Sequence, residues 1–411
     1  MSDRKTDKNG PLAGLKVLDL SRVLAGPWAT QVLADFGAEV WKIEKPGDGD
    51  DTRKWGKSIV PSNIGEDSEK LTAYYLCANR GKYSLAIDIK SPQGQKIICA
   101  LVAKADILVE NFKVGNLAKY GLDYTSLSAL NPKLIYCSIT GFGQTGPFAD
   151  QAGYDAMIQA SAGLMSITGE PDGPPQKVGV AVSDLMTGMY AVTAILAALY
   201  HRDKTGRGQQ IDLSLFDTQV GWLANQGMDY LTSKKIPKRF GSAHPSIVPY
   251  QPMRSSDQPF MLAIGNDRQF ERCCEVIELP LLSGDERFNT NNRRMQNRIL
   301  LIQLLEEIFL TKSSKHWLEL LGKERIPCGP INNLEQVFEH PQIKARNTCF
   351  TLSHSEHGEI PQIANPVKFS ETPIHYQKLA PDLGQDTKQV LAEQLSFSDS
   401  EMAELIKLNV I

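Results

Sequence analysis

Short apolar runs alternate with amphipathic stretches near the start of the chain. Residues 16–20 and 39–44 are apolar runs of the length expected for buried strands. The stretch 28–36 between them has helical periodicity and ends at Gly37, a residue that often follows the last turn of a helix. Together these three segments predict a strand–helix–strand unit.

The same alternation returns further along the chain. A helix is predicted to begin after Ser91, because serine is a good N-cap and Pro92 suits the first helical position. Three more strands are predicted around this helix, at residues 83–87, 106–109 and 133–138. Strands that alternate with helices usually form a parallel sheet covered on both faces. We therefore expect an α/β fold with a doubly wound, Rossmann-like large domain.

A different pattern follows in the second half. Residues 183–203 predict a long, mostly buried helix, and residues 210–214 predict a strand after it. Four prolines between residues 234 and 254 indicate a linker. One strand and three helices are predicted beyond it, at residues 260–264, 269–277, 296–310 and 314–321.

From about residue 335 the chain is predicted to be rich in loops. It should end in a helix opened by a capping box, in which Ser398 precedes Glu401 by three residues. The whole pattern predicts a large domain over residues 12–225, a smaller α+β domain over residues 240–333, and a segment over residues 334–411 that returns to the large domain.

Composition and charge exclude several classes of function. The 44 basic and 47 acidic side chains leave a net charge of −3, so no basic excess points to nucleic acid. The 7 cysteines form no C-x-x-C pair, which favours free thiols in a reducing compartment. The first ten residues are polar, and the longest nearly apolar run, 185–200, is shorter than the roughly 20 residues of a spanning helix. We expect a cytoplasmic protein that does not bind membranes.

The sequence does not support three other kinds of site: a dinucleotide site, a metal site and a serine hydrolase nucleophile. Residues 141–146 read G-F-G-Q-T-G, but Pro147 follows and no helix is expected before about Tyr154, whereas a dinucleotide site needs its third glycine in an opening helix. The histidines are scattered without a cluster at ligand spacing, so no metal site is expected. No G-x-S-x-G elbow indicates a serine hydrolase.

Asp184, near the start of the predicted helix 183–203, admits two interpretations. Ser183 or Asp184 can be a plain N-cap that accepts hydrogen bonds from amides of the first turn. Alternatively, a carboxylate held ionised at a helix N-terminus can attack an activated acyl group and form an anhydride. The spacing of residues alone leaves both open.

The chain resembles the class III CoA-transferases, a family that also includes formyl-CoA and carnitine CoA-transferases and the α-methylacyl-CoA racemases. The resemblance extends over nearly the whole chain and rests on several motifs in the family's order. They are L-x-G-L-K-V-L-D-L-S-R-V-L-A-G-P (12–27), V-W-K-I-E-K-P-G-x-G-D (40–50), D-I-L-V-E-N-F (106–112), G-F-G-Q-T-G-P (141–147), S-D-L-x-T-G (183–188) and H-R-D-K-T-G-R-G-Q (201–209).

The resemblance implies that Asp184 is the nucleophile and that CoA binds to the large domain. The implied CoA contacts are Val23, Leu24, Lys45, Ile87, Asn111, Phe112 and Lys119. Arg80 and Lys82, like Lys45 and Lys119, are chemically suited to the phosphates of CoA. Lys45 stands where an arginine is common in the family, so it would act as a point charge.

The residues of the implied acyl pocket help to distinguish a racemase from a transferase and to indicate the acid that a transferase would use. Racemases of the family carry a histidine base where this chain has Tyr154, and tyrosine is a poor base for an α-proton. Tyr154 and Asp155 are expected to line the pocket instead. The segments 241–251, 263–269 and 326–333 look most like the succinate/glutarate-type transferases, and the G-G-G-G loop of formyl-CoA transferases is missing. The distal carboxylate of a dicarboxylate acid would need a cation, for which Arg22, Arg53 and His244 are candidates.

The resemblance therefore implies reversible transfer of CoA from an acyl-CoA, such as succinyl-CoA, to a carboxylic acid such as glutarate. The CoA thioester is expected to be a substrate, and neither a permanently bound cofactor nor a metal is expected. Members of the family form interlocked homodimers, so we expect the same assembly. An α-methylacyl-CoA racemase, a transferase for another acid and a non-catalytic CoA-binding protein remain alternatives.

Overall fold

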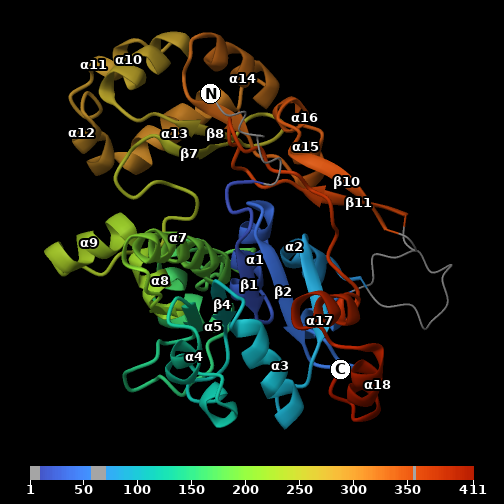
Figure 1. Ribbon diagram of the computed structural model, residues 1–411. Helices are drawn as coiled ribbons and strands as arrows, with labels where there is room; N and C mark the ends of the chain where they lie inside the picture. Colours follow the sequence, from blue (N-terminus) through green and yellow to red (C-terminus); the bar gives the residue numbers. More distant parts are fainter. Residues whose placement is uncertain (1–9, 57–70, 355–357) are drawn as a thin grey trace. The chain divides into compact units, whose positions relative to one another are not determined.

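The computed structural model describes residues 10–56, 71–354 and 358–411 (Figure 1). The chain divides into two compact units. Unit 1 comprises residues 1–164, 178–231 and 346–411 within the described ranges, and unit 2 comprises residues 165–177 and 232–345. These units differ from the predicted domains at two places. Residues 334–345 group with unit 2 and not with the return segment, and residues 165–177 also group with unit 2.

Unit 1 is built on a six-stranded parallel sheet with the order β3-β2-β1-β4-β5-β6. The strands are β1 (Lys16–Asp19), β2 (Glu39–Glu44), β3 (Lys82–Ala86), β4 (Ile107–Glu110), β5 (Ile135–Thr140) and β6 (Gln210–Ser214). In the register, Val17 lies between Val40 and Ile107. This is the order of the doubly wound fold, so the predicted α/β class with a parallel sheet is confirmed.

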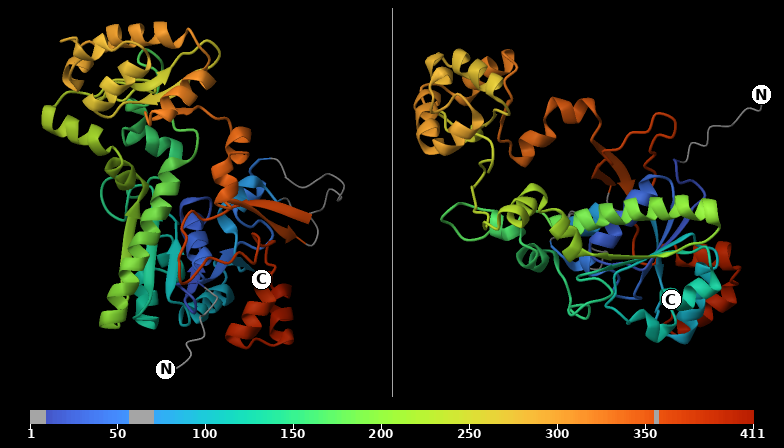
Figure 2. Two further views of the ribbon diagram at one scale, coloured as in Figure 1. Left: turned by 90° about the horizontal axis from the view of Figure 1, so that it is seen from above. Right: turned by 90° about the vertical axis from the view of Figure 1, so that its left-hand side faces the viewer.

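Helices cover both faces of this sheet (Figure 2). One face packs against α1 (Ala25–Asp35), α5 (Asp155–Ser161), α7 (Val182–Thr205) and α8 (Leu215–Gly221). The other packs against α3 (Pro92–Val102), α4 (Tyr124–Leu130), α17 (Thr387–Leu395) and α18 (Asp399–Lys407). Successive residues of the strands, such as Val17 and Leu18, enter opposite cores, which explains why the strands read as continuous apolar runs.

Helix α7 has one buried face and one exposed face. Val192, Ile195 and Leu199 are buried against α1 and the sheet, whereas Tyr190 and Tyr200 are exposed. The prediction of a mostly buried helix was therefore too strong. By length and composition α7 also passes as a membrane span, the single helix to do so in the described ranges, but a core helix passes the same test.

Unit 2 combines a three-stranded antiparallel sheet with helices around its own core. The strands are β7 (Tyr250–Met253), β8 (Phe260–Ala263) and β9 (Cys328–Pro330). The helices are α10 (Asp267–Val276), α11 (Leu281–Gly284), α12 (Asn291–Gln296), α13 (Arg298–Phe309), α14 (Ser314–Lys323), α15 (Leu334–Phe338) and α16 (Pro341–Ala345). Asn266 and Ser313 cap α10 and α14 through their side chains.

The C-terminal part of unit 1 is more regular than predicted. It contains the antiparallel hairpin of β10 (Cys349–His354) and β11 (Gly358–Ile363), where the sequence indicated loops. The predicted capping box of Ser398 and Glu401 is confirmed at the start of α18. Five other helical segments occur in the described ranges: α2 (Ala73–Asn79), α6 (Leu164–Ile167), α9 (Ala224–Ser233) and the 3-10 turns Asp51–Lys54 and Leu117–Tyr120.

Candidate active site

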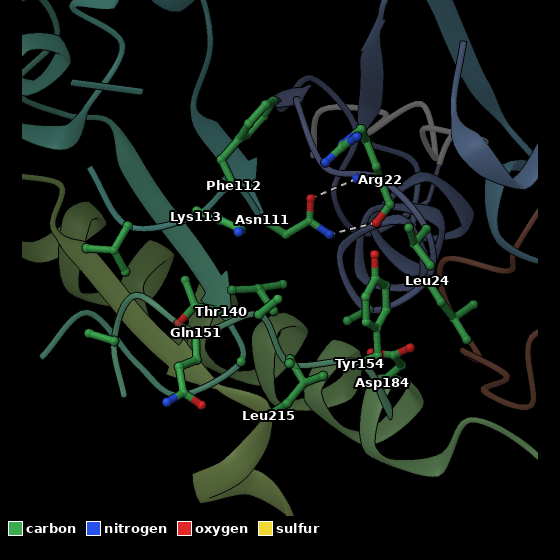
Figure 3. Close-up of a pocket in the computed structure, with 18 of the residues that line it drawn as sticks. Arg22, Leu24, Asn111, Phe112, Lys113, Thr140, Gln151, Tyr154, Asp184 and Leu215 are labelled. Atoms are coloured by element: carbon green, nitrogen blue, oxygen red, sulfur yellow. Dashed lines mark hydrogen bonds between the residues drawn. The ribbon is translucent and has the colours of Figure 1, made fainter. Parts of the chain in front are cut away.

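A pocket of ≈ 180 Å³ opens in unit 1 where β1 and β4 lie side by side (Figure 3). Its walls include residues 22–25 after β1, residues 111–114 after β4, and residues 139–141 at the end of β5. The chain leaves β1 toward β2 on one side and β4 toward β5 on the other, so this is the switch point of the sheet. Ligands of doubly wound proteins bind in the crevice outside the carboxyl ends of strands at this point.

Asp184, the predicted nucleophile, lines this pocket together with Tyr154, Leu24 and Asn111. Burial raises the pKa of Asp184 to about 7, and the nearby charge of Asp155 adds to the effect. This direction is opposite to the one expected for a carboxylate at a helix N-terminus, and its causes are burial and the Asp155 carboxylate.

The start of α7 is held by Asp155 rather than by its own side chains. Its N-cap is Ala181, and neither Ser183 nor Asp184 caps the helix. The Ser183 amide donates to Asp155 Oδ1 at 2.8 Å, while Asp155 Oδ2 accepts from Gln159 Nε2 at 2.7 Å. The capping interpretation of Asp184 therefore fails, and its carboxyl group is left to face the pocket. Asp155 is near enough for its charge to raise the pKa of Asp184. Tyr154 lines the pocket but Asp155 does not, so the predicted role of Asp155 in the acyl pocket stays a prediction.

Asn111 joins the turns after β4 and β1. Its Oδ1 accepts from the Arg22 amide at 2.9 Å and its Nδ2 donates to the Arg22 carbonyl at 2.6 Å, shown as dashed lines in Figure 3. The Arg22 guanidinium lies 5.4 Å from the ring of Phe112 and 3.2 Å from Asp51, and it is half exposed. Asn111 thus holds the turn after β1 in place, and Arg22 contributes a positive charge to the pocket wall.

A second pocket of ≈ 210 Å³ adjoins the first and shares Arg22 and Phe112 with it. Lys45, Ile87 and Lys90 also line it. Lys45 forms an exposed ion pair with Asp48, and such a pair is readily exchanged for another anion. The structure therefore brings Val23, Leu24, Asn111 and Phe112 of the predicted CoA contacts to the first pocket, and Lys45, Ile87 and Phe112 to the second.

Three predicted cations lie inside the protein instead. Arg53 donates to both carboxylate oxygens of Glu44, at 2.9 and 2.7 Å, and is 7% exposed. Arg80 is paired with Asp35 at 2.9 Å, and the fully buried Lys82 donates to Asp19 at 3.1 Å. Their donors are used within the fold, so the predicted contacts of Arg80 and Lys82 with phosphates, and of Arg53 with an acyl carboxylate, are corrected.

Two further predictions concern residues away from these pockets. Lys119 is exposed on the 3-10 turn Leu117–Tyr120, where it donates to Asn116 at 3.2 Å. His244 belongs to unit 2, and its Nδ1 accepts from the Ser246 amide at 3.0 Å. The roles of Lys119 and His244 stay predictions.

Sequence reasoning missed several residues of the pocket wall. Lys113 lines the pocket of Asp184 and also a smaller neighbouring pocket. Thr140 and Gln151 line the pocket of Asp184 as well. Lys113 follows the E-N-F motif directly, so its position next to Asn111 and Phe112 was a usable signal. Asp50 and Lys42 bind backbone groups of the turn after β1. Both lie in the motif of residues 40–50, from which only Lys45 was predicted as a contact.

The pocket has no obvious metal or dinucleotide features. No group of three potential ligands from His, Cys, Asp and Glu occurs within residues 10–56, 71–354 and 358–411. The glycines 141–146 follow β5, and the next helix, α5, begins only at Asp155. A dinucleotide fingerprint would follow the first strand and open a helix.

Comparisons with known proteins agree with this geometry. The sequence model of CoA-transferase family III matches residues 12–387. A succinate–glutarate CoA-transferase of Agrobacterium fabrum is 48% identical over 387 residues, covering 94% of this chain and 96% of the relative. The human succinyl-CoA:glutarate CoA-transferase is 43% identical over 401 residues, with 98% and 90% covered.

Solved structures give the same result. A CaiB/BaiF family protein of Brucella suis superposes with a TM-score of 0.82 at 48% identity, over 94% of this chain and all of that one. A protein of Mycobacterium tuberculosis reaches 0.83 at 28% identity, with 95% and 99% covered. The match of sequence, fold and motif order extends over nearly the whole chain, which therefore belongs to CoA-transferase family III and is an enzyme of that class.

Proposed function

We propose that the enzyme transfers CoA reversibly from succinyl-CoA to a dicarboxylic acid such as glutarate, through covalent intermediates on Asp184. The observation that carries the proposal is the position of the Asp184 carboxyl group in the wall of the switch-point pocket, without a capping role. The substrate class is supported by the names of relatives at 43–48% identity.

The chemistry balances without ATP, metal or redox cofactor. Ionised Asp184 attacks the thioester carbonyl, the carbon–sulfur bond breaks, and an acyl-aspartyl anhydride and CoA thiolate form. The thiolate attacks the aspartyl carbonyl, which releases the donor acid and leaves an aspartyl-CoA thioester. The acceptor carboxylate then attacks this thioester, which expels CoA thiolate and forms a second anhydride with Asp184. The thiolate attacks the acceptor carbonyl of that anhydride, which gives the new acyl-CoA and frees the Asp184 carboxylate.

The pocket offers groups for each part of the substrates. The second pocket, with Lys45 and Lys90, suits the anionic end of CoA, and the shared Arg22 and Phe112 lie between it and Asp184's pocket. Among the cations predicted for a distal carboxylate, Arg22 lines the pocket, so we assign it that contact. Tyr154 and Asp155 complete the acyl side.

The enzyme is also proposed to act as a homodimer, as its resemblance to the family implies. Support comes from exposed apolar side chains on α7 and α9, which include Tyr190, Tyr200, Met228 and Leu231. Light scattering tests this directly. A particle of twice the 45.4 kDa chain mass is expected, and a monomer at working concentration would contradict it.

Mass spectrometry of CoA esters tests the proposed activity. Purified protein is incubated with succinyl-CoA and, in separate reactions, glutarate, oxalate, itaconate or carnitine, beside an Asp184→Asn control. We expect glutaryl-CoA from the wild type alone. A different acyl-CoA would correct the acceptor, and exchange of the α-proton without any acceptor acid would replace the transferase by a racemase.

A further inference from the structure

The turn between β1 and α1 holds a strained residue in the wall of the pocket. Val23 has a φ of +72°, in the left-handed region that a β-branched residue strongly disfavours. Val23 lines the same pocket as Asp184, and Leu24 after it is the N-cap of α1. Such strain persists only where the surrounding structure imposes it, and it concentrates at functional sites.

A buried ion pair imposes this conformation from behind the turn. The Val23 amide donates to both carboxylate oxygens of Asp50, at 3.3 and 3.2 Å. Lys42 Nζ donates to Asp50 Oδ2 and to the Ser21 carbonyl, both at 2.9 Å. Both side chains of the pair are fully buried. Lys42 and Asp50 thus fix the peptide groups on either side of Arg22.

The pair is itself firmly anchored. Lys42 lies within β2, beside Asp19 of β1. Asp50 accepts from the Thr52 amide and hydroxyl at 3.0 and 2.8 Å, and its own amide donates to Glu44 at 2.9 Å. The support therefore comes from groups held against the sheet. Neither Lys42 nor Asp50 lines the pocket of Asp184, although both line the second pocket.

The opposite side of the turn has a separate restraint. Asn111, at the end of β4, binds the amide and the carbonyl of Arg22, as described above. Asn111 therefore holds the same two peptide groups as Lys42 and Asp50, through their other polar atoms. In the Arg22–Val23 peptide, the carbonyl accepts from Asn111 and the amide donates to Asp50.

We propose that Lys42 and Asp50 are positioning residues for catalysis: they hold Val23 in its left-handed conformation and so place the pocket wall opposite Asp184. This rests on the proposed role of Asp184. The substrate thioester is then aligned by a wall whose position depends on two charges outside the pocket of Asp184. Small displacements of such walls can reduce turnover about 100-fold, because the reacting atoms lose alignment.

A double-mutant cycle tests this inference. Asp50→Asn removes the charge that holds Lys42 and the Val23 amide, and is expected to lower kcat by about 100-fold with a smaller change in KM. Val23→Gly removes the strain, because glycine adopts positive φ freely. In the Val23→Gly background, Asp50→Asn should lower kcat by less than about 10-fold, which is a coupling that independent effects would not show.

A matched control separates positioning from loss of stability. Asp35→Asn breaks the buried pair with Arg80 at the far end of α1, and should lower the melting temperature but keep kcat. If Asp50→Asn is insoluble, Lys42→Met/Asp50→Asn, which removes both charges, replaces it in the cycle. Equal losses of kcat in both Val23 backgrounds would overturn the inference while leaving the transferase intact. A wild type without transferase activity would overturn the proposed function, and this inference with it.

Discussion

Two groups of buried carboxyls lie in unit 1, and their surroundings differ. Asp19, Glu44 and Asp50, the paired carboxyls, each have a buried cation, namely Lys82, Arg53 and Lys42. Burial opposes ionisation of Asp50, but the charge of Lys42 prevails and holds its pKa at about 2. For Asp19 and Glu44 the nearby cations likewise outweigh burial, and the pKa of each is lowered.

Asp184 and Glu110, the lone carboxyls, have no ion-pair partner in the part of the chain that the structure describes. Burial raises the pKa of each to about 7. The comparison teaches that burial alone does not identify a catalytic carboxyl. The charge of each paired carboxyl is balanced by a cation inside the fold. A lone carboxyl has no such cation, so it can react with a substrate.

The largest effect is expected from removing the lone carboxyl in the pocket. Asp184→Asn should lower kcat by about 10⁴-fold or more, because the amide cannot form the anhydride. Stability should stay equal or rise, since a buried group without a cation becomes neutral. Glutaryl-CoA formation and thermal unfolding measure the two effects. Activity within about 10-fold of the wild type would remove Asp184 from the mechanism.

Breaking a paired carboxyl should affect stability instead. Arg53→Met leaves Glu44 buried without its main partner, and should lower the free energy of unfolding by about 3–5 kcal/mol in urea titrations. Arg22→Met is the matched control for stability, because the Arg22–Asp51 pair is half exposed and should contribute less than about 1 kcal/mol. Equal losses for both variants would contradict the distinction between buried and exposed pairs.

Glu110 offers a lone carboxyl outside the proposed reaction. It lies at the end of β4 and accepts from the Phe112 amide at 2.8 Å. Its folded-state pKa of about 7 exceeds the unfolded value, so the native state binds the proton more tightly. Stability is therefore lost as pH rises from about 4 to about 7.

Glu110→Gln should remove this loss. We expect the variant to be more stable than the wild type by about 1–3 kcal/mol at pH 8 and nearly equal to it at pH 5. Urea unfolding at the two pH values measures the difference. The same change at both pH values would mean that Glu110 does not titrate with a raised pKa.

The smallest expected effect concerns the neighbour of Asp184. In the wild type, kcat/KM should rise with pH through about 7, because only the ionised carboxylate is a nucleophile. Asp155→Asn removes one of the two causes of the raised pKa of Asp184 and should move this rise to lower pH. Relative to each plateau, activity at pH 6 should increase about 3-fold. An unchanged profile would exclude the coupling.

The central strands of the sheet could be predicted well because they are buried on both faces, and the edge strand β6 could be predicted because its apolar and polar residues alternate. Residues 39–44 and 210–214 were predicted with the bounds that the structure shows. The hairpin of β10 and β11 was missed because the side chains of β10 are at most partly buried and include Thr351 and Ser353. A strand without a buried face gives little hydrophobic signal.

The site was predicted less evenly, since a charge in the sequence does not reveal its partner. Asp184, Asn111 and Phe112 were found through motifs that follow strands or open a helix. Lys82 and Arg53 had equally suitable chemistry, but in the folded chain their side chains donate to Asp19 and Glu44. Asp155 caps α7 across a separation of 28 residues, a contact that only the folded chain brings about.

Isotope transfer to Asp184 tests the central claim most directly. The wild type is turned over with succinyl-CoA and glutarate labelled with oxygen-18 in its carboxylates, then digested and measured by mass spectrometry. The mechanism leaves one acceptor oxygen on Asp184 in each turnover, so the peptide containing it should become heavier by about 2 Da per exchanged oxygen. Glutaryl-CoA formed while this peptide stays unlabelled would contradict the covalent role of Asp184.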